Sequence, residues 1–144
     1  MAKTSPVPLY VRMGNVLTTT LVRAGFKVGR IHLLTVRGRK SGQPRTTPIV
    51  VVEQDGKRYL AAPYGVVDWV RNLRAAAGEV TLTRGRRAET VTARELPTDE
   101  AALILRADIK RNPFARYYQV TADSSLEDFE RATVSHPLFV LEKK

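Results

Sequence analysis

Residues 33–48 of this 144-residue chain, LLTVRGRKSGQPRTTP, decide its fold. The run begins with apolar and β-branched residues, which favour a strand, and a second run of this kind extends from Thr46 to Glu53. Glycine, serine, proline and basic residues lie between the two runs, a composition typical of a turn. The sequence therefore predicts strands over 31–36 and 46–53 that are joined by a basic turn.

Further strands and helices are expected after this pair. Asp55-Gly56 predicts a tight hairpin, because glycine accepts the positive φ that such a turn requires. The expected elements that follow are a strand over 58–62, a helix over 66–77, strands over 79–83 and 90–94, a helix capped by Thr98 that ends near Lys110, a short helix over 125–132 and a strand over 138–141. About six largely antiparallel strands with helices between hairpins predict a single small β-barrel with surrounding helices, of the α+β or mainly β class.

Length and composition bound the class of protein. A chain of 144 residues is expected to form one domain, residues 1–144, and its 43% hydrophobic content supplies a core. The sequence has no cysteine, which excludes disulfides, thiolate nucleophiles and cysteine-ligated metals. His32 and His136 are its two histidines, so no three-histidine metal site can form and no metal site is expected. We expect His32 to be structural within a strand and His136 to belong to a turn.

Positive charge is concentrated in the first half of the chain. The formal net charge is +10, and residues 1–75 contain 13 basic and three acidic side chains. Residues 76–144 contain 11 of each sign. This distribution predicts an anionic partner, which charge alone leaves open among a phosphorylated small molecule, nucleic acid and anionic lipid.

Residues 9–24 predict an amphipathic helix, because apolar residues recur there at helical spacing and Gly25 follows as a stop signal. Packing of this helix on the domain core is favoured. The alternative is a helix on a membrane surface, which basic residues beside an apolar stripe would suit. The first six residues lack the apolar core of a secretory signal. We therefore expect a cytoplasmic protein, either soluble or peripheral to the inner face of the membrane.

The basic turn carries the residues best suited to bind an anion. Arg37, Arg39, Lys40 and Arg45 are four cations within nine residues, with no acid among them. Arginine offers a planar fork of donors that fits phosphate or carboxylate, and lysine acts as a point charge. The order of residues matches neither the Walker phosphate-binding loop nor the glycine motif of dinucleotide-binding folds. The turn predicts an anion cradle between two strands.

The run from Gly38 to Pro48, GRKSGQPRTTP, resembles the signature of the deazaflavin-dependent nitroreductase family. These proteins are split β-barrel flavin and deazaflavin oxidoreductases of actinobacteria. The resemblance continues through Asp55-Gly56 and through the pattern Trp69-x-x-Asn72-Leu73. It covers residues 30–95, and residues 97–142 are compatible with the family's C-terminal helices and last strand.

The resemblance implies that the cofactor is coenzyme F420, whose tail carries phosphate, carboxylate and oligoglutamate. Such a tail is strongly anionic, which would explain the excess of positive charge in residues 1–75. The positions implied to bind the cofactor are Arg39, Lys40, Ser41, Arg45, Thr46, Thr47, Pro48, Ala61, Ala62, Trp69 and Asn72. Of these, Arg39, Lys40 and Arg45 are implied to hold the phosphate and carboxylates.

The implied activity is that of a reductase, which transfers a hydride from F420H2 to an electron-poor small molecule. Candidate acceptors are an activated carbon–carbon double bond, a quinone and a nitroaromatic. Pro63-Tyr64 departs from the family pattern, and because proline has no N–H to donate, Tyr64 or water is the expected contact there. Tyr64 and Tyr118 are the candidate catalytic residues, as contacts for the acceptor or for its proton.

Two alternatives and one question stay open at this point. Flavin mononucleotide is the alternative cofactor, because it is also anionic. A small basic barrel that binds single-stranded nucleic acid is the alternative of another class, although aromatic residues make up only 7% of the chain and do not alternate with the basic residues. The chain is expected to be a monomer or a homodimer.

Overall fold

The computed structural model describes residues 31–76, 78–112 and 114–143. The helix expected over 9–24 lies outside the described residues. In chain order the elements are β1 (Ile31–Arg37), β2 (Pro44–Gln54), β3 (Lys57–Ala61), α2 (Asp68–Ala75), β4 (Glu79–Arg84), β5 (Arg87–Glu95), α3 (Thr98–Asp108), the short 3-10 helix η1 (Ala115–Tyr118), α4 (Leu126–Ser135) and β6 (Phe139–Lys143).

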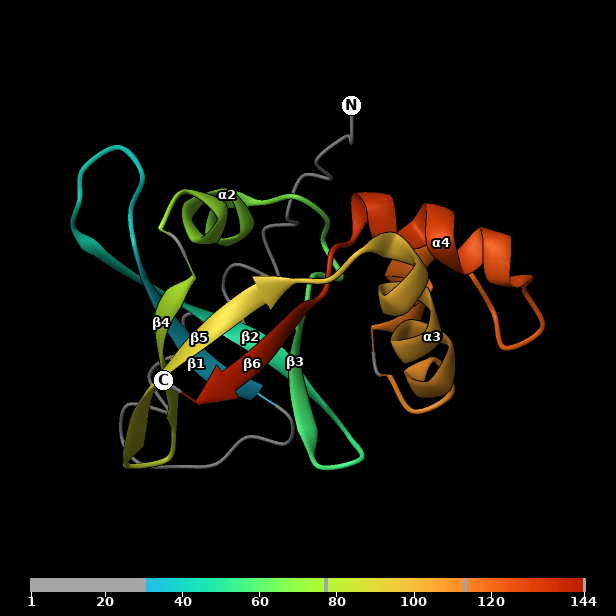
Figure 1. Ribbon diagram of the computed structural model, residues 1–144, viewed down its shortest axis with the longest axis horizontal. Helices are drawn as coiled ribbons and strands as arrows, with labels where there is room; N and C mark the ends of the chain where they lie inside the picture. Colours follow the sequence, from blue (N-terminus) through green and yellow to red (C-terminus); the bar gives the residue numbers. More distant parts are fainter. Residues whose placement is uncertain (1–30, 77, 113, 144) are drawn as a thin grey trace.

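The strands form a closed barrel in the order β1-β2-β3-β6-β5-β4, and every neighbouring pair is antiparallel (Figure 1). The hairpin of β1 and β2 pairs Val36 with Arg45, which places the basic turn just beyond one end of the barrel. Pairing of Leu34 in β1 with Leu82 in β4 closes the ring. Closure leaves the described strands no unpaired edge. The predicted antiparallel barrel is confirmed.

Alternation along β2 separates the barrel interior from its outer surface. Ile49 and Val51 face a buried interior cluster, while Val50 and Val52 belong to a second apolar cluster on the outside. This follows from the two-residue period of a strand, and both faces of β2 are apolar because both are covered. The continuous run of valine and isoleucine therefore marks a strand that is buried on two sides.

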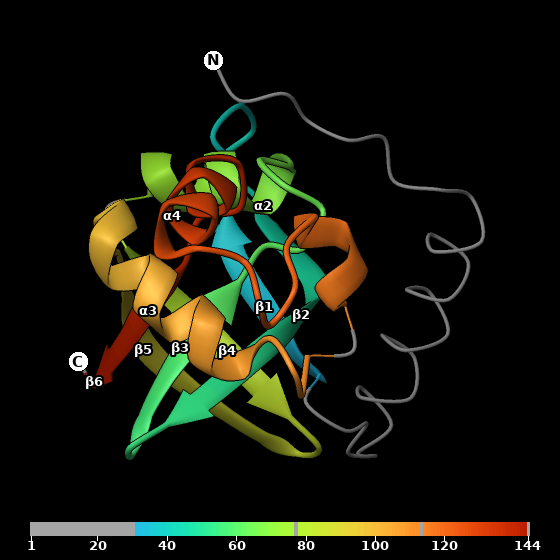
Figure 2. The ribbon, with the colours of Figure 1, turned by 90° about the vertical axis from the view of Figure 1, so that its right-hand side faces the viewer.

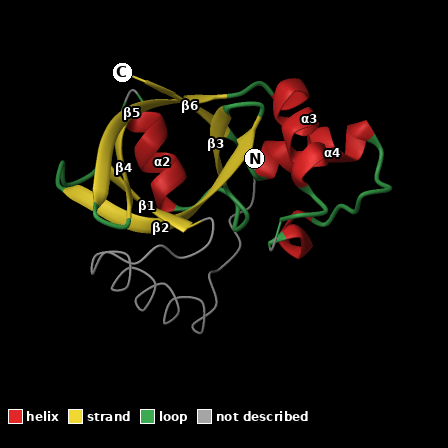
Figure 3. Ribbon diagram, turned by 90° about the horizontal axis from the view of Figure 1, so that it is seen from below, coloured by secondary structure: helices red, strands yellow, loops and turns green. Residues whose placement is uncertain are grey.

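Helix α2 covers one end of the barrel, and Figure 3 shows it within the ring of strands. Val70 is completely buried and Leu73 is 2% exposed, and both pack with the interior residues of the strands. The helix begins at Asp68, two residues after the predicted Val66, because Gly65 adopts a φ of 87° and Val67 bonds back to it. Burial of its apolar face fixes α2 beside the basic turn.

Helices α3 and α4 pack against each other beside the barrel (Figure 2). Ala101 of α3 belongs to the apolar cluster on the outside of the barrel. Phe129 of α4 belongs to a separate cluster that the two helices share. A capping box of Ser125 and Asp128 starts α4, the helix predicted over 125–132, which extends to Ser135. Thr98 does not cap α3: Pro97 holds the N-cap position without a side-chain hydrogen bond, so that prediction was wrong.

Two further observations complete the fold. The 3-10 helix of residues 115–118 was not predicted, since four residues carry too little periodicity to reveal it. None of the helices in the described part of the chain is long and apolar enough to cross a membrane.

Candidate active site

A cavity of about 830 Å³ opens beside the basic turn and runs along β2 toward the end of β3. The turn between β1 and β2 forms one end, α2 forms one wall, and Tyr64 and Phe114 form the other end. The predicted cofactor-binding residues that line it are Arg39, Lys40, Ser41, Arg45, Thr46, Thr47, Pro48, Ala61, Trp69 and Asn72. The structure thus brings together residues that the sequence spreads over three elements.

The basic turn is held by its own backbone. The Gly38 N–H donates to the Gln43 carbonyl at 2.8 Å, and the Gly42 N–H donates to the Gly38 carbonyl at 2.9 Å. A side chain at Gly38 would lie 3.1 Å from the Ser41 hydroxyl, so this position favours glycine. Ser41 also accepts from the Gln43 N–H at 3.2 Å. The hydroxyl predicted as an anion donor is therefore also part of the turn's own geometry.

Arg39 is anchored to α2 by Asn72. The Asn72 Oδ1 accepts from the Arg39 backbone N–H at 3.1 Å and from Arg39 Nη1 at 2.8 Å. Asn72 is only 6% exposed, and buried amide groups of this kind are costly to leave without partners. The resemblance implies that Asn72 binds the cofactor, and the structure shows that its side-chain carbonyl oxygen fixes the turn.

Lys40 and Arg45 are exposed at the same end of the cavity. Among the residues that the structure describes, no carboxylate forms an ion pair with either of them. Arg39, by contrast, has Nη2 3.3 Å from Asp68 Oδ1. Within the described residues, the cationic end therefore contains two cations without an acidic partner at close range, and a third cation, Arg39, that pairs with Asp68.

Thr46, Thr47 and Pro48 form the part of β2 that continues the cavity from the turn, and all three are half-buried. The Thr46 hydroxyl lies 2.8 Å from the Thr35 hydroxyl across the β1–β2 pair. That contact orients Thr46 and leaves one of the two hydroxyls with a hydrogen to donate elsewhere. The strand thus presents hydroxyl and apolar groups next to the cations.

The far end of the cavity is aromatic. Tyr64 packs edge to face on Phe114 at 6.1 Å between ring centroids, and on Tyr117 at 4.8 Å. Trp69 lines the wall between the two ends and its ring lies 5.8 Å from that of Phe139, inside the barrel. The indole therefore contacts both the core and the cavity. Phe114 was missed because nothing around it in the sequence signals a cavity.

Two predicted residues lie elsewhere. Ala62 is 1% exposed and packs within the barrel interior, although its neighbours Ala61 and Pro63 line the cavity. Tyr118 is 2% exposed, belongs to the cluster of α3 and α4, and is absent from the described cavity lining. The sequence could not place Tyr118, since adjacent tyrosines in a helical turn point about 100° apart and either could face the cavity.

His136 supports the cavity wall from behind. Its Nδ1 lies 3.0 Å from the Ala62 carbonyl oxygen, and because a carbonyl only accepts, Nδ1 carries the hydrogen. Its ring packs on that of Tyr118 at 4.9 Å. Burial lowers the pKa of His136, while its hydrogen bonds to the backbone of Ala62 and Pro63 act in the opposite direction. His136 is thus a neutral imidazole that fixes the segment before Tyr64.

The arrangement fits an elongated ligand that is anionic at one end and planar at the other. Guanidinium and ammonium groups at the turn are the donors that phosphate and carboxylates require. Hydroxyl and apolar groups follow along β2, and aromatic edges close the far end. Polar groups that converge on a mainly apolar cavity are typical of cofactor and substrate sites.

Comparison with known proteins decides which ligand this is. The family model described as F420H(2)-dependent quinone reductase matches residues 10–127. The chain belongs to this family. It is therefore an F420H2-dependent reductase, and coenzyme F420 is its cofactor. The resemblance of the basic turn to deazaflavin-dependent enzymes is confirmed.

Solved structures agree on the fold of this reductase. One described as a domain-swapped dimer is 25% identical, with a TM-score of 0.59, and the match covers 92% of this chain and 97% of that one. The F420-H2 dependent reductase FDR-A is 28% identical, with a TM-score of 0.55 and coverage of 79% and 95%. Atu2129 of Agrobacterium tumefaciens is 19% identical over 99% of this chain and 58% of that one, with a TM-score of 0.59, and supports the fold alone. No curated protein matches the chain.

The alternatives lose their support at this point. The family match does not support flavin mononucleotide as the cofactor of this reductase. In the described strands the aromatic residues are Tyr59 and Phe139, which are 6% and 2% exposed. Stacking of nucleic-acid bases needs exposed aromatic rings on the barrel surface, so these strands offer no such platform.

The lowered pKa of His136 predicts a pH-dependent stability. In the unfolded chain His136 takes up a proton near the ordinary histidine pKa of about 6.5. In the folded protein it takes up this proton only at a lower pH. The free energy of unfolding should therefore be highest above about pH 6.5 and fall as the pH decreases toward the lowered pKa of the folded state. Urea denaturation at about pH 7.5 and about pH 5 measures the difference.

His136→Asn is the control for this effect. The variant should be less stable than the natural protein at the higher pH, because the hydrogen bond to Ala62 and the ring contact with Tyr118 are altered. It should also lose less stability on acidification, because it lacks the imidazole whose pKa is lowered in the folded protein. An equal loss in the two proteins would contradict the role given to His136.

Proposed function

We propose that this reductase binds the anionic tail of F420H2 at Arg39, Lys40 and Arg45 and reduces a quinone-type acceptor beside Tyr64 and Phe114. One observation carries the proposal: a single cavity joins a cationic end to an aromatic end. The cationic end matches phosphate and carboxylates, and the aromatic end matches a planar, electron-poor ring. The name of the family supports a quinone as the acceptor.

The residues present fit the cofactor. Lys40 and Arg45 carry charges that no carboxylate among the described residues pairs with, and Arg39 is held in place by Asn72. Thr46, Thr47 and Pro48 would hold the part of the cofactor that follows the tail along β2. When bound, the reduced deazaflavin supplies a hydride, which makes the cofactor a two-electron donor.

The residues of the chain itself position the bound molecules and exclude water from the cavity. Asn72 and the turn fix the cationic groups before a ligand arrives, so binding needs little further ordering of this end. Trp69, Tyr64 and Phe114 give the cavity apolar walls that displace water. Tyr64 is the proposed contact for the acceptor, and its hydroxyl or solvent provides the proton. Tyr118 is set aside from this role because it is buried behind His136.

Titration of the purified protein with coenzyme F420, with flavin mononucleotide in parallel, tests the cofactor. Preferential binding of F420 is expected. Steady-state assays with F420H2 and a quinone, an enone and a nitroaromatic then compare kcat/KM among acceptors. A quinone should give the highest value. A clear preference for an enone or a nitroaromatic would contradict the proposed acceptor class but not the F420H2-dependent reductase activity.

Removal of the two cations without acidic partners should weaken cofactor binding. Lys40→Ala and Arg45→Ala are each expected to raise the Kd for F420 by about tenfold, since a charge-assisted hydrogen bond contributes roughly 1.5–3 kcal/mol and part of this is screened by solvent. The double variant should show a larger loss and a smaller dependence of Kd on salt. Arg131→Ala, on α4, is the control of equal charge change. Tight F420 binding by the double variant would contradict the assignment of the basic turn.

Replacement of Tyr64 should separate acceptor binding from cofactor binding. Tyr64→Ala removes the ring that packs on Phe114, so KM for the quinone should rise by up to about tenfold, as expected for an aromatic contact of roughly 0.5–1.5 kcal/mol. The Kd for F420 should stay unchanged. Tyr64→Phe keeps the ring and should keep KM, and a fall in kcat would assign the proton to the hydroxyl. Tyr118→Phe is the control, and an equal rise of KM in that variant would contradict the placement.

Assembly and location form a separate part of the proposal. We infer a homodimer or a monomer, and the similarity to a structure described as a domain-swapped dimer favours the homodimer. The single-domain boundary of 1–144 stays a prediction. Association with the inner face of the membrane through residues 9–24 is tested by co-sedimentation with anionic vesicles at low salt. Recovery of all the protein in the supernatant would contradict association with the membrane.

A further inference from the structure

His136 lies where the two walls of the aromatic end of the cavity come together. It is the C-cap residue of α4, and its backbone N–H donates to the Ala132 carbonyl at 2.9 Å, so the end of the helix fixes where its side chain begins. The imidazole is half-buried and is not among the described residues that line the cavity. Its contacts nevertheless reach both segments that carry the aromatic rings of the cavity.

One contact is with the turn that carries Tyr64. The Gly65 N–H donates to the Ala62 carbonyl at 3.0 Å, which defines a β-turn with Pro63 and Tyr64 at its two central positions. His136 Nδ1 donates to the same carbonyl oxygen at 3.0 Å. A carbonyl oxygen has two lone pairs, so it can accept both hydrogen bonds. The imidazole therefore ties the first residue of this turn to the end of α4.

The second contact is with the segment on the other side of Tyr64. The ring of His136 packs on that of Tyr118, the last residue of η1, at 4.9 Å between centroids. The same helix carries Tyr117, whose ring lies 4.8 Å from that of Tyr64, and Phe114 directly precedes it. One imidazole thus contacts both the turn that presents Tyr64 and the helix that presents its neighbouring rings.

We propose that His136 is a positioning residue for the electron acceptor. By holding the turn of residues 62–65 against η1, it sets the separation of the rings of Tyr64 and Phe114. The inference rests on the proposed function, because that function places the acceptor beside these two rings. The spacing matters because aromatic rings attract one another only within centroid separations of about 4.5–7 Å. His136 acts through Tyr64 and does not itself contact the acceptor.

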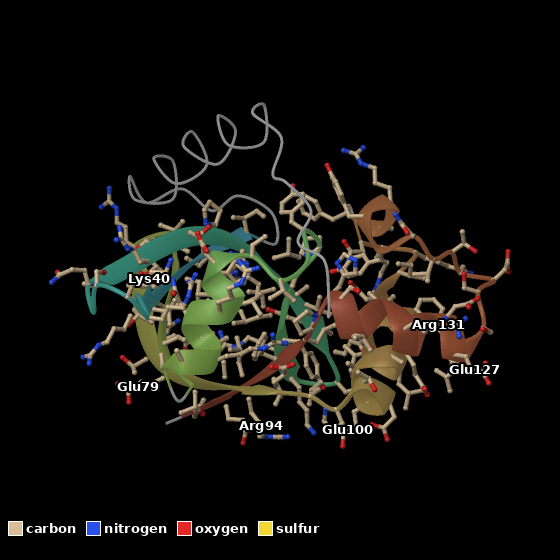
Figure 4. The ribbon with its side chains drawn as sticks, turned by 90° about the horizontal axis from the view of Figure 1, so that it is seen from above. Lys40, Glu79, Arg94, Glu100, Glu127 and Arg131 are labelled. Atoms are coloured by element: carbon tan, nitrogen blue, oxygen red, sulfur yellow. The ribbon has the colours of Figure 1, made fainter. Side chains whose placement is uncertain are left out.

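The cationic end of the cavity should not respond to changes at His136. Figure 4 shows Lys40 of the basic turn and Arg131 of α4 at opposite ends of the molecule. The contacts that hold the basic turn come from Asn72 on α2 and from the backbone of the turn itself. Loss of His136 should therefore weaken acceptor binding and leave F420 binding intact, a separation that general destabilisation of the fold would not produce.

Two substitutions separate the two contacts of the imidazole. His136→Asn keeps an N–H donor for the Ala62 carbonyl and loses the ring, whereas His136→Phe keeps a ring against Tyr118 and loses the donor. Thr133→Val is the matched control, because Thr133 is 3% exposed on the same helix and its hydroxyl donates to backbone carbonyls of α3 and α4. The control removes buried hydrogen bonding from α4 that involves neither wall of the aromatic end.

Steady-state kinetics with F420H2 and a quinone give KM for each variant, and fluorescence titration gives the Kd for F420. Each His136 variant should raise KM for the quinone by about three- to tenfold, the loss expected from one hydrogen bond or one ring contact. The Kd for F420 should stay within about twofold of that of the natural protein, since distant sites without shared partners act independently. Thr133→Val should change neither constant.

A double-mutant cycle with Tyr64→Ala tests whether His136 acts through Tyr64. In the Tyr64→Ala background, His136→Phe should raise KM by less than about twofold further, because the ring that it positions is already absent.

Amide hydrogen exchange of the ligand-free protein gives a readout that needs no acceptor. The Gly65 N–H, which closes the turn, should exchange about three- to tenfold faster in His136→Phe, because the turn is no longer tied to α4. Its exchange rate in Thr133→Val should equal that of the natural protein.

Each outcome has a definite meaning. An unchanged KM in both His136 variants overturns the inference, as does an equal rise of KM in Thr133→Val. Fully additive effects of His136→Phe and Tyr64→Ala also overturn it, because His136 would then not act through Tyr64. An unchanged KM in Tyr64→Ala alone would overturn the proposed acceptor site instead, and exchange of the Gly65 amide would still decide whether His136 holds the turn.

Discussion

The contact between the Asn72 carbonyl oxygen and Arg39 is the interaction on which the rest of the site depends. It joins the turn between β1 and β2 to the helix that covers the barrel end. Helix α2 is in turn fixed by burial of Val70 and Leu73 among the interior residues of the strands. Through this chain of contacts, the hydrophobic free energy of the core sets the position of the basic turn relative to the barrel.

The two ends of the cavity are stabilised in different ways. The cationic end is polar and exposed, and its shape comes from backbone hydrogen bonds within a short turn. The aromatic end depends on elements far apart in the chain, since Tyr64 follows β3 and Phe114 precedes η1. His136, at the end of α4, bonds to the carbonyl of Ala62 and connects the second end to the outer helices. A reductase needs both ends at a fixed separation, and the closed barrel between them provides it.

Much of the fold could be predicted because its elements carry local signals. The β-branched run of β2 and the Asp55-Gly56 hairpin each specify their structure within a few neighbouring residues. The helix α2 was predicted two residues too early, since the apolar pattern continues through Val66 and Val67 while the conformation of Gly65 delays the helix. The cap of α3 was misplaced because threonine is a common N-cap residue, whereas in the structure Thr98 is already the first helical residue and Pro97 precedes it.

The sequence by itself determined the chemistry of the cationic end, because the residues of the basic turn are neighbours in the chain and their types alone indicate an anion. It also indicated the family, since that same short run is specific. Only the tertiary structure decided which tyrosine faces the cavity, that Asn72 holds Arg39, and that Asp68 shares the cavity with the cations. The contacts of Arg39 with Asn72 and Asp68 join residues 33 and 29 positions apart, and a separation of that kind is set by the closure of the barrel and the packing of α2 rather than by local preference.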